Sequence, residues 1–483
     1  MKSLTRHLLD RLPLAKVVLM SFSFVMDHAS LDQLFEEHRG KAYTRKLSFS
    51  TLVYLIRDAL ISRQEGTRRH LERAKANQQL PASVVAFYGK LARLPLEVSL
   101  AFVRHGAAQV AQLLPPDSPR WIAPASLAEF DLCALDGKVV KHVKHRLKAT
   151  RAVRGKLQGA KLQLAQDMRS GLALAMNCHE DADCNEVRLT QGLLQQLHAR
   201  RQEQLDGGRT ATLRPLLCTS DRQYSDLSCP RLFQENSGHF LIRHNRTLGF
   251  EPDPQRPAQE GTDSRGRRFK QEWGWAGKQG RNDRLYVRRI TLFRPELDDD
   301  DVILLTDLLD AVRYPAVDLL ELYLQRWGIE RMFQAVTEVF DLRHLIGTTP
   351  KAAIFQSALC FVLYNILQVL RSYVAADAQL PVAEVSGEKL FDDVRDQLGA
   401  WALLAEPADT IEQLFPALPA AELQSQLRTR LRWRPLWRKS KPRTRPSQRG
   451  RTIHVKGGRS SVFKLLEAEK QRKKREKHKL ARR

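Results

Sequence analysis

Three side chains that could act together on a phosphate group lie at helical spacing between Tyr323 and Thr337. Tyr323, Arg326 and Glu330 are three and four residues apart, and apolar residues recur around them with the period of an amphipathic helix. On a helix the three side chains share one face. A phenol, a guanidinium and a carboxylate on one face could contact phosphate and help to hold a metal ion. A surface Arg–Glu pair on an ordinary helix is the alternative interpretation.

Two aspartates follow apolar runs that predict buried strands. Asp136 follows residues 132–135 and precedes Gly137, and Asp221 follows the strand predicted over 213–218. An aspartate on a central strand is costly unless a partner such as a metal ion neutralises it. The carboxyl end of such a strand is also where open α/β sheets place ligands. Each residue has a structural alternative, because Asp136-Gly137 fits a turn between strands and Asp221 fits a helix cap.

Together these residues resemble the signature of the DDE transposases of the insertion sequence 4 family. In that signature Tyr, two residues, Arg, three residues and Glu are followed, six residues later, by Lys. Tyr323, Arg326 and Glu330 match, whereas Thr337 stands at the position of the Lys. The resemblance covers most of the chain, roughly residues 25–375, and does not include the tail from residue 431 onward. A Lys at position 337 would add a positive charge on phosphate, so its absence predicts weaker binding of DNA ends unless another cation substitutes.

The resemblance implies a catalytic trio of Asp136, Asp221 and Glu330. Three carboxylates can hold two Mg2+ ions about 3.5–4 Å apart, and Mn2+ can substitute because both ions prefer oxygen ligands. The implied reaction is nicking at the ends of an insertion sequence, followed by transfer of the free 3′-hydroxyl into target DNA. The implied partners are double-stranded DNA, both element ends and target, and a second copy of the chain in a homodimer.

The predicted DNA contacts lie around this trio and in a segment rich in Gly, Pro and Arg. The resemblance implies that Tyr323 and Arg326 contact the terminal phosphates. Tryptophans beside basic residues suit stacking on an unpaired base. The alternative for these tryptophans is a small hydrophobic patch. The remaining predicted DNA contacts are Arg222, Trp273, Trp275 and Arg288.

The expected fold is α/β, with a ribonuclease-H-like catalytic core that would bring strand-borne aspartates and a helix-borne glutamate together. A helical N-terminal domain precedes the core. The basic residues interleaved with its apolar positions fit either DNA binding through phosphate contacts or an ordinary solvated basic face. The predicted regions are 1–125, the helical domain; 126–244 and 302–375, the core; 245–301, a β-rich insertion; 376–430, C-terminal helices; and 431–483, a basic tail.

The charge of the chain is concentrated at its C-terminal end. The 483 residues carry a net charge of +25, and residues 431–483 contain 21 Lys and Arg against three acidic residues. Nucleic acid is the first candidate partner for such a chain, and an anionic membrane surface is the second. The tail composition predicts either disorder or a lone helix near 462–479 that binds nucleic acid without sequence preference.

The remaining composition favours a globular protein of a reducing compartment. Apolar residues make up 43% of the chain, and the six cysteines are scattered without a disulfide or zinc spacing. Residues 352–370 contain no charge and are long enough to span a bilayer, but three amide side chains favour a buried core helix. No signal peptide is predicted. We expect a soluble, cytoplasmic protein, and the resemblance implies a bacterial, nucleoid-associated one.

Two other functions fit the same residues. One is a catalytically inactive, transposase-derived protein that binds DNA and uses its carboxylates structurally. The other is a nuclease that cuts without joining. Convergence of Asp136, Asp221 and Glu330 would favour catalysis, and pairing of these carboxylates with internal Arg or Lys would favour the structural role.

Overall fold

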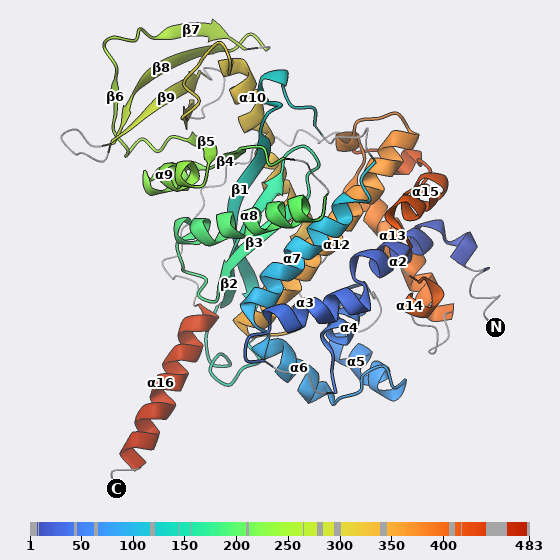
Figure 1. Ribbon diagram of the computed structural model, residues 1–483. Coiled ribbons are helices and arrows are strands. Elements are labelled where there is room, and N and C mark those ends of the chain that lie inside the picture. Colours follow the sequence, from blue (N-terminus) through green and yellow to red (C-terminus); the bar gives the residue numbers. More distant parts are fainter. Residues whose placement is uncertain are drawn as a thin grey trace.

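One ten-stranded β-sheet runs through the middle of the computed structural model (Figure 1). Its strand order is β3-β2-β1-β4-β5-β10-β9-β8-β6, and β7 pairs with β8. The residues that the structure describes are 7, 9–42, 46–61, 66–115, 121–143, 145–155, 157–208, 212–263, 265–277, 284–293, 301–338, 345–404, 411–416, 418–440 and 461–480.

Five strands form the half of the sheet that carries the aspartates: β1 (Asp131–Val143), β2 (Leu157–Asp167), β3 (Ala173–His179), β4 (Leu216–Ser220) and β5 (Gly238–Arg243). β1, β2 and β3 pair in antiparallel fashion, whereas β1, β4 and β5 pair in parallel. Every residue of β4 is buried, as expected for a parallel strand covered on both faces. The chain is therefore a mixed α/β protein with a central sheet.

β1 passes through Asp136 without a turn. Asp136 pairs with Leu164 of β2, and Gly137 pairs with Gln163. The alternative prediction of a turn at Asp136-Gly137 is therefore wrong, because both residues lie inside one long strand. A partly buried carboxylate in the middle of a strand needs neighbours that compensate its charge.

Three helices pack against β3: α7 (Leu96–Ala111), α8 (Thr190–Asp206) and α12 (Pro350–Asp377); α8 and α12 also pack against β2. α12 confirms the buried core helix predicted over 352–370. Two segments of the described chain, Pro13–His38 and α12, are long and apolar enough to cross a membrane, and the apolar window of α12 is entirely buried inside the protein.

Helices fill the N-terminal region, as its periodicity predicts: α2 (Pro13–Val25), α3 (His28–His38), α4 (Phe49–Ile61), α5 (Thr67–Ala76) and α6 (Val84–Arg93). Their core is continuous with that of the sheet region. Phe49 lies 5.6 Å, between ring centroids, from Phe355 of α12 and 6.2 Å from Phe102 of α7. The N-terminal helices thus pack directly on the helices that cover the sheet.

The β-rich segment extends the main sheet: β6 (Phe250–Pro252), β7 (Gln259–Thr262), β8 (Arg268–Ala276), β9 (Leu285–Leu292) and β10 (Val302–Thr306). β9 pairs antiparallel with β10, and β10 pairs with β5. The segment predicted as an insertion, 245–301, is therefore hydrogen-bonded through β9 to β10, a strand of the predicted core.

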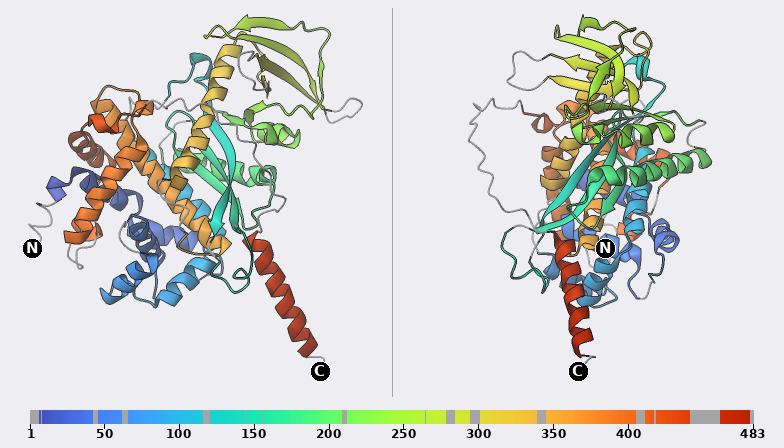
Figure 2. Two further views of the ribbon diagram at one scale, coloured as in Figure 1. Left: turned by 180° about the vertical axis from the view of Figure 1, so that it is seen from behind. Right: turned by 90° about the vertical axis from the view of Figure 1, so that its left-hand side faces the viewer.

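The C-terminal region is more ordered than its composition predicts. Its helices are α13 (Gly387–Leu404), α14 (Ile411–Leu414), α15 (Ala420–Arg430) and α16 (Val462–Leu480). Trp437 is buried and donates its indole N–H to Asp393 at 2.8 Å, so disorder is wrong for residues 431–440. α16 matches the predicted lone helix and projects from the body as a single rod (Figure 2). Residues 441–460 of the predicted tail lie outside the described residues.

Candidate active site

The register of two parallel strands places Asp136 beside Asp221. Ala134 of β1 pairs with Thr219 of β4, and each aspartate lies two residues beyond that pair. Asp221 directly follows β4 and caps the short helix η3 (Arg222–Ser225), where its Oδ1 accepts the backbone N–H of Gln223 at 2.9 Å. The capping alternative for Asp221 is therefore correct, and capping occupies only one of its two carboxylate oxygens.

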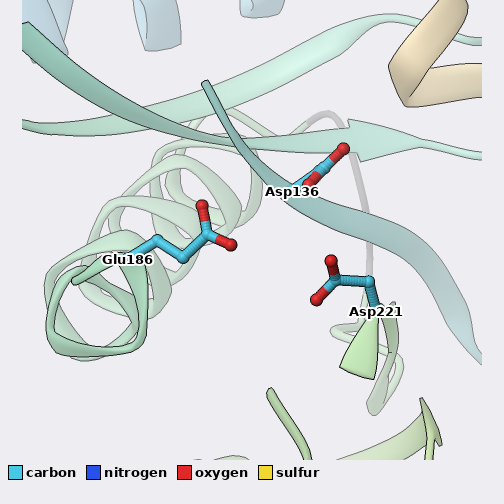
Figure 3. A group of neighbouring side chains, drawn as sticks. All are labelled: Asp136, Glu186 and Asp221. Carbon is cyan, nitrogen blue, oxygen red and sulfur yellow. The ribbon is translucent and has the colours of Figure 1, made fainter. Parts of the chain in front are cut away.

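Glu186 is the third carboxylate at this point (Figure 3). It begins the short helix η2 (Glu186–Leu189), which leads into α8. One oxygen from each of Asp136, Glu186 and Asp221 can be chosen so that all three lie within 4.8 Å of one another. Within the described ranges, this is the one group of acidic, His or Cys side chains with a spacing that could hold a metal ion.

Gly137 leaves the room that Glu186 occupies. A Cβ atom at position 137 would lie 1.6 Å from Glu186 Oε2 and 2.7 Å from its Cδ. Lys161 of β2 forms an ion pair with the same Oε2 at 2.8 Å, and Glu186 is only 4% exposed. The missing Cβ of Gly137 and the ammonium of Lys161 thus hold the Glu186 carboxylate next to Asp136.

Gly137→Ala should displace the Glu186 carboxylate and lower the affinity of the apoprotein for Mn2+ by about tenfold or more, the scale expected when a metal site loses its supporting contacts. Calorimetric titration measures that affinity. Gly159→Ala is the matched control, because its Cβ would lie 2.7 Å from Val143 and away from the carboxylates. Equal Mn2+ affinities in the two variants would contradict a metal-binding role for Glu186.

Burial and neighbouring acids perturb the charge state of Asp136. Burial raises the pKa of Asp136 to about 7, and the charges of Asp221 and Glu186 act in the same direction. Arg326 opposes this rise, with its Nη1 at 4.0 Å from Asp136 Oδ2. Strongly perturbed carboxylates in a cluster are typical of functional sites. Carboxylate oxygens are also the ligands that Mg2+ and Mn2+ prefer.

This raised pKa makes the stability of the metal-free protein depend on pH. Between the usual value of 3.8 and about 7, the folded protein binds a proton on Asp136 that the unfolded chain releases. The free energy of unfolding should therefore fall as pH rises from 5 to 8 in EDTA, by about 2.5 kcal/mol, since about two pKa units of the shift lie in this range at roughly 1.4 kcal/mol per unit. Thermal unfolding of wild type beside Asp136→Asn measures this. An unchanged pH slope in the variant would contradict the assignment.

The signature segment forms two consecutive helices, α10 (Ala316–Gln325) and α11 (Trp327–Glu338), with Arg326 between them. Tyr323 and Arg326 are 4% and 5% exposed. Arg326 Nη2 donates to Glu330 Oε1 at 2.7 Å, while its Nη1 faces Asp136. The surface-pair alternative therefore fails for Arg326, because its guanidinium is buried between two carboxylates.

The structure brings two members of the predicted trio together and links the third to them through a cation. Asp136 and Asp221 lie in the carboxylate cluster, and Glu330 is joined to Asp136 by the guanidinium of Arg326. The Glu330 side chain is 37% exposed. The sequence patterns did not single out Glu186 as a site residue.

The predicted DNA contacts differ in their exposure. The Tyr323 hydroxyl is buried, and burial raises its pKa, whereas the charge of the neighbouring Arg326 opposes that rise. Arg222 and Trp275 are partly exposed. Trp275 packs edge-on against Tyr286. These three remain predictions as DNA contacts.

Trp273 and Arg288 require a correction. Trp273 is 1% exposed and donates its indole N–H to the Leu309 carbonyl at 2.9 Å, so the hydrophobic-patch alternative is right for it. Arg288 is fully buried, and its guanidinium donates to Gln271 and to the Tyr314 carbonyl. Internal partners already occupy both side chains, so neither presents a surface to DNA in this structure.

Comparison with known proteins gives a family match over the segment that contains the carboxylates. Residues 128–366 match the family model for the transposase DDE domain. This match supports a DDE transposase, and the matched range includes Asp136, Glu186, Asp221 and Glu330. No curated protein matches the chain. A cryo-EM structure of the piggyBac transposase synaptic complex with hairpin DNA is similar over 83% of this chain and 85% of that chain, at 10% identity and a TM-score of 0.40. That similarity is too low to carry an argument about this chain.

Proposed function

We propose that the protein is the DNA transposase of an insertion sequence, of the insertion sequence 4 type. It would cut DNA at the element ends and join the 3′-hydroxyl to target DNA by two-metal phosphoryl transfer. The observation that carries this proposal is the pair Asp136 and Asp221, side by side on adjacent parallel strands within the segment that matches the DDE family model. Asp136, Asp221 and Glu330 are the proposed catalytic carboxylates.

The side chains at the proposed site are suited to binding divalent metal ions. Three carboxylates converge, and the space they share exists because Gly137 lacks a Cβ. Asp136, Asp221 and Glu186 would hold one Mg2+ ion and Glu330 would help to hold a second. When bound, such ions lower the pKa of an attacking water or 3′-hydroxyl and stabilise the leaving oxygen. Arg326 would orient Glu330 and balance the charge of Asp136.

The strand arrangement supports a ribonuclease-H-like core. Three antiparallel strands, β3-β2-β1, continue into two parallel strands, β4 and β5. In the proposed core, the aspartates come from the first and fourth strands and Glu330 from a helix that packs on β1. This arrangement lets residues that are distant in the sequence share one metal site.

Basic surface on α16 supports DNA as the partner. Residues 470–475 are all exposed, and five of these six side chains are Lys or Arg. The first turns of α16 are held to the body, since Ser461 donates to Asp181 at 2.9 Å and Lys464 to Asp183 at 2.6 Å. A basic helix that is anchored at one end and projects from the body can contact phosphates along a DNA duplex. A homodimer is part of the proposal, because a reaction at two element ends needs two sites.

A catalytically inactive DNA-binding protein is the second candidate function. Internal ion pairs favour it, because Glu330 is bound by Arg326 and Glu186 by Lys161. In that case the carboxylates would stabilise the fold by balancing buried cations.

Strand cleavage and strand transfer distinguish the two functions. The substrate is DNA from the regions that flank the coding sequence, incubated with Mg2+ and either wild type or Glu330→Gln. We expect wild type to cut and join, and the variant to bind the same DNA without cutting. Binding by both proteins with cleavage by neither would overturn the transposase proposal in favour of the inactive DNA-binding protein.

A further inference from the structure

Thr337 lies in the last turn of α11, at a position where a lysine would place a positive charge. Its hydroxyl donates to the carbonyl of Phe333, one turn earlier, at 2.7 Å. The side chain is therefore folded back on its own helix. A threonine in this conformation offers no charge to a phosphate group near the carboxylates.

A lysine from another element reaches the same carbonyl. Lys138 of β1 donates its Nζ to the Phe333 carbonyl at 3.1 Å, and the ammonium lies 5.2 Å from the centroid of the Phe333 ring. Lys138 follows Asp136 by two residues, so both side chains lie on the same face of β1. The β1 strand thus carries a cation to the part of α11 where Thr337 lies, on the face that also bears the catalytic carboxylates.

The ammonium of Lys138 is not neutralised by a close carboxylate. Among the described residues, no acidic oxygen lies within ion-pair distance of its Nζ. The charges that act on it from further away are those of Asp136, Glu338 and Lys141. A lysine ammonium has three N–H donors, and the Phe333 carbonyl accepts one of them. A partly buried cation with unused donors favours the approach of an anion.

We propose that Lys138 supplies the positive charge that Thr337 lacks, by binding a phosphate of the DNA strand that lies against the carboxylate cluster. This proposal rests on the proposed function for the identity of the anion. Lys138 is a positioning residue here: it fixes the backbone of the DNA strand next to Asp136, and Arg326 holds the carboxylate side of the same site.

Metal-free binding tests the phosphate contact without requiring catalysis. The probe is the flanking DNA used above, titrated in EDTA over a series of salt concentrations. Loss of one phosphate contact should reduce the slope of log affinity against log salt by about 0.9. Lys138→Met, which keeps the aliphatic length, should show this reduction. Lys141→Met, an exposed lysine on the same strand, should show less or none.

A charge-relocation variant separates this role from a structural one. In the Lys138→Met background, Thr337→Lys should restore the salt slope and the cleavage rate, because it returns a cation to the same region from α11. Lys138→Arg should retain most of the binding. A wild-type slope in Lys138→Met, or no rescue by Thr337→Lys in a protein that unfolds at the wild-type temperature, would overturn the proposal. Failure of the transposase function itself would appear separately, as wild-type protein that binds but never cuts.

Discussion

Asp136→Asn should abolish metal-dependent strand cleavage while leaving DNA binding intact. The substitution keeps the shape of the side chain and removes the charge that would hold a divalent ion. Asp136 lies within β1, where it pairs with Leu164 of β2, and close to Asp221, which directly follows β4. We expect the cleavage rate to fall by at least about 10²–10³-fold, the cost of losing one preorganised electrostatic contact to the transition state.

Asp131→Asn is the matched control for this prediction. Asp131 begins the same strand and pairs with Arg201 at 3.3 Å, away from the carboxylate cluster. Cleavage rates measured on the flanking DNA in Mg2+ should be close to wild type for Asp131→Asn. Equal loss in both variants would indicate damage to the strand rather than to a metal site, and wild-type cleavage by Asp136→Asn would remove Asp136 from the mechanism.

Glu186→Gln and Glu330→Gln should separate metal binding from catalysis. Glu186 lies within the cluster, so we expect its variant to lose Mn2+ affinity by about 10–100-fold in the absence of DNA. Glu330 is bound to Arg326, so its variant should bind the first ion nearly as wild type and lose cleavage instead. Calorimetric titration and single-turnover cleavage measure the two effects on the same preparations.

Glu338→Gln serves as a control, because Glu338 is an exposed acid on the same helix as Glu330. It should change neither Mn2+ affinity nor cleavage strongly. If Glu186→Gln bound Mn2+ with wild-type affinity, the Glu186 carboxylate would be a structural partner of Lys161 and not a metal ligand.

Local patterns were enough to predict much of the sheet region. The apolar run over 132–135 lies in β1, the strand predicted over 213–218 overlaps β4, and the uncharged segment 352–370 lies in α12, because burial on a sheet or in a core imposes its pattern on the sequence. Asp136 and Asp221 could be selected because an aspartate directly after an apolar run is unusual without a compensating partner.

Other features depend on contacts between distant segments, which a sequence pattern does not encode. Glu186 begins a helix, where an acid is common for its interaction with the helix dipole, so nothing local marked it as a site residue. Only an indirect indication of this role is present in the sequence: the glycine beside Asp136, Gly137, lacks the Cβ atom that would occupy the space of the Glu186 carboxylate. No local pattern distinguishes a tryptophan or arginine that faces DNA from one that faces the core. Trp273 of β8 pairs with Arg288 of β9, and both side chains are buried.

Diffraction from crystals soaked in Mn2+, with anomalous differences recorded, tests the central claim most directly. The account predicts an ion bound between the carboxylates of Asp136, Glu186 and Asp221 in wild type, and its loss in Asp136→Asn. The contradicting result is a structure in which the Lys161–Glu186 and Arg326–Glu330 ion pairs are intact and no Mn2+ lies between the carboxylates. That result would favour the DNA-binding role without catalysis.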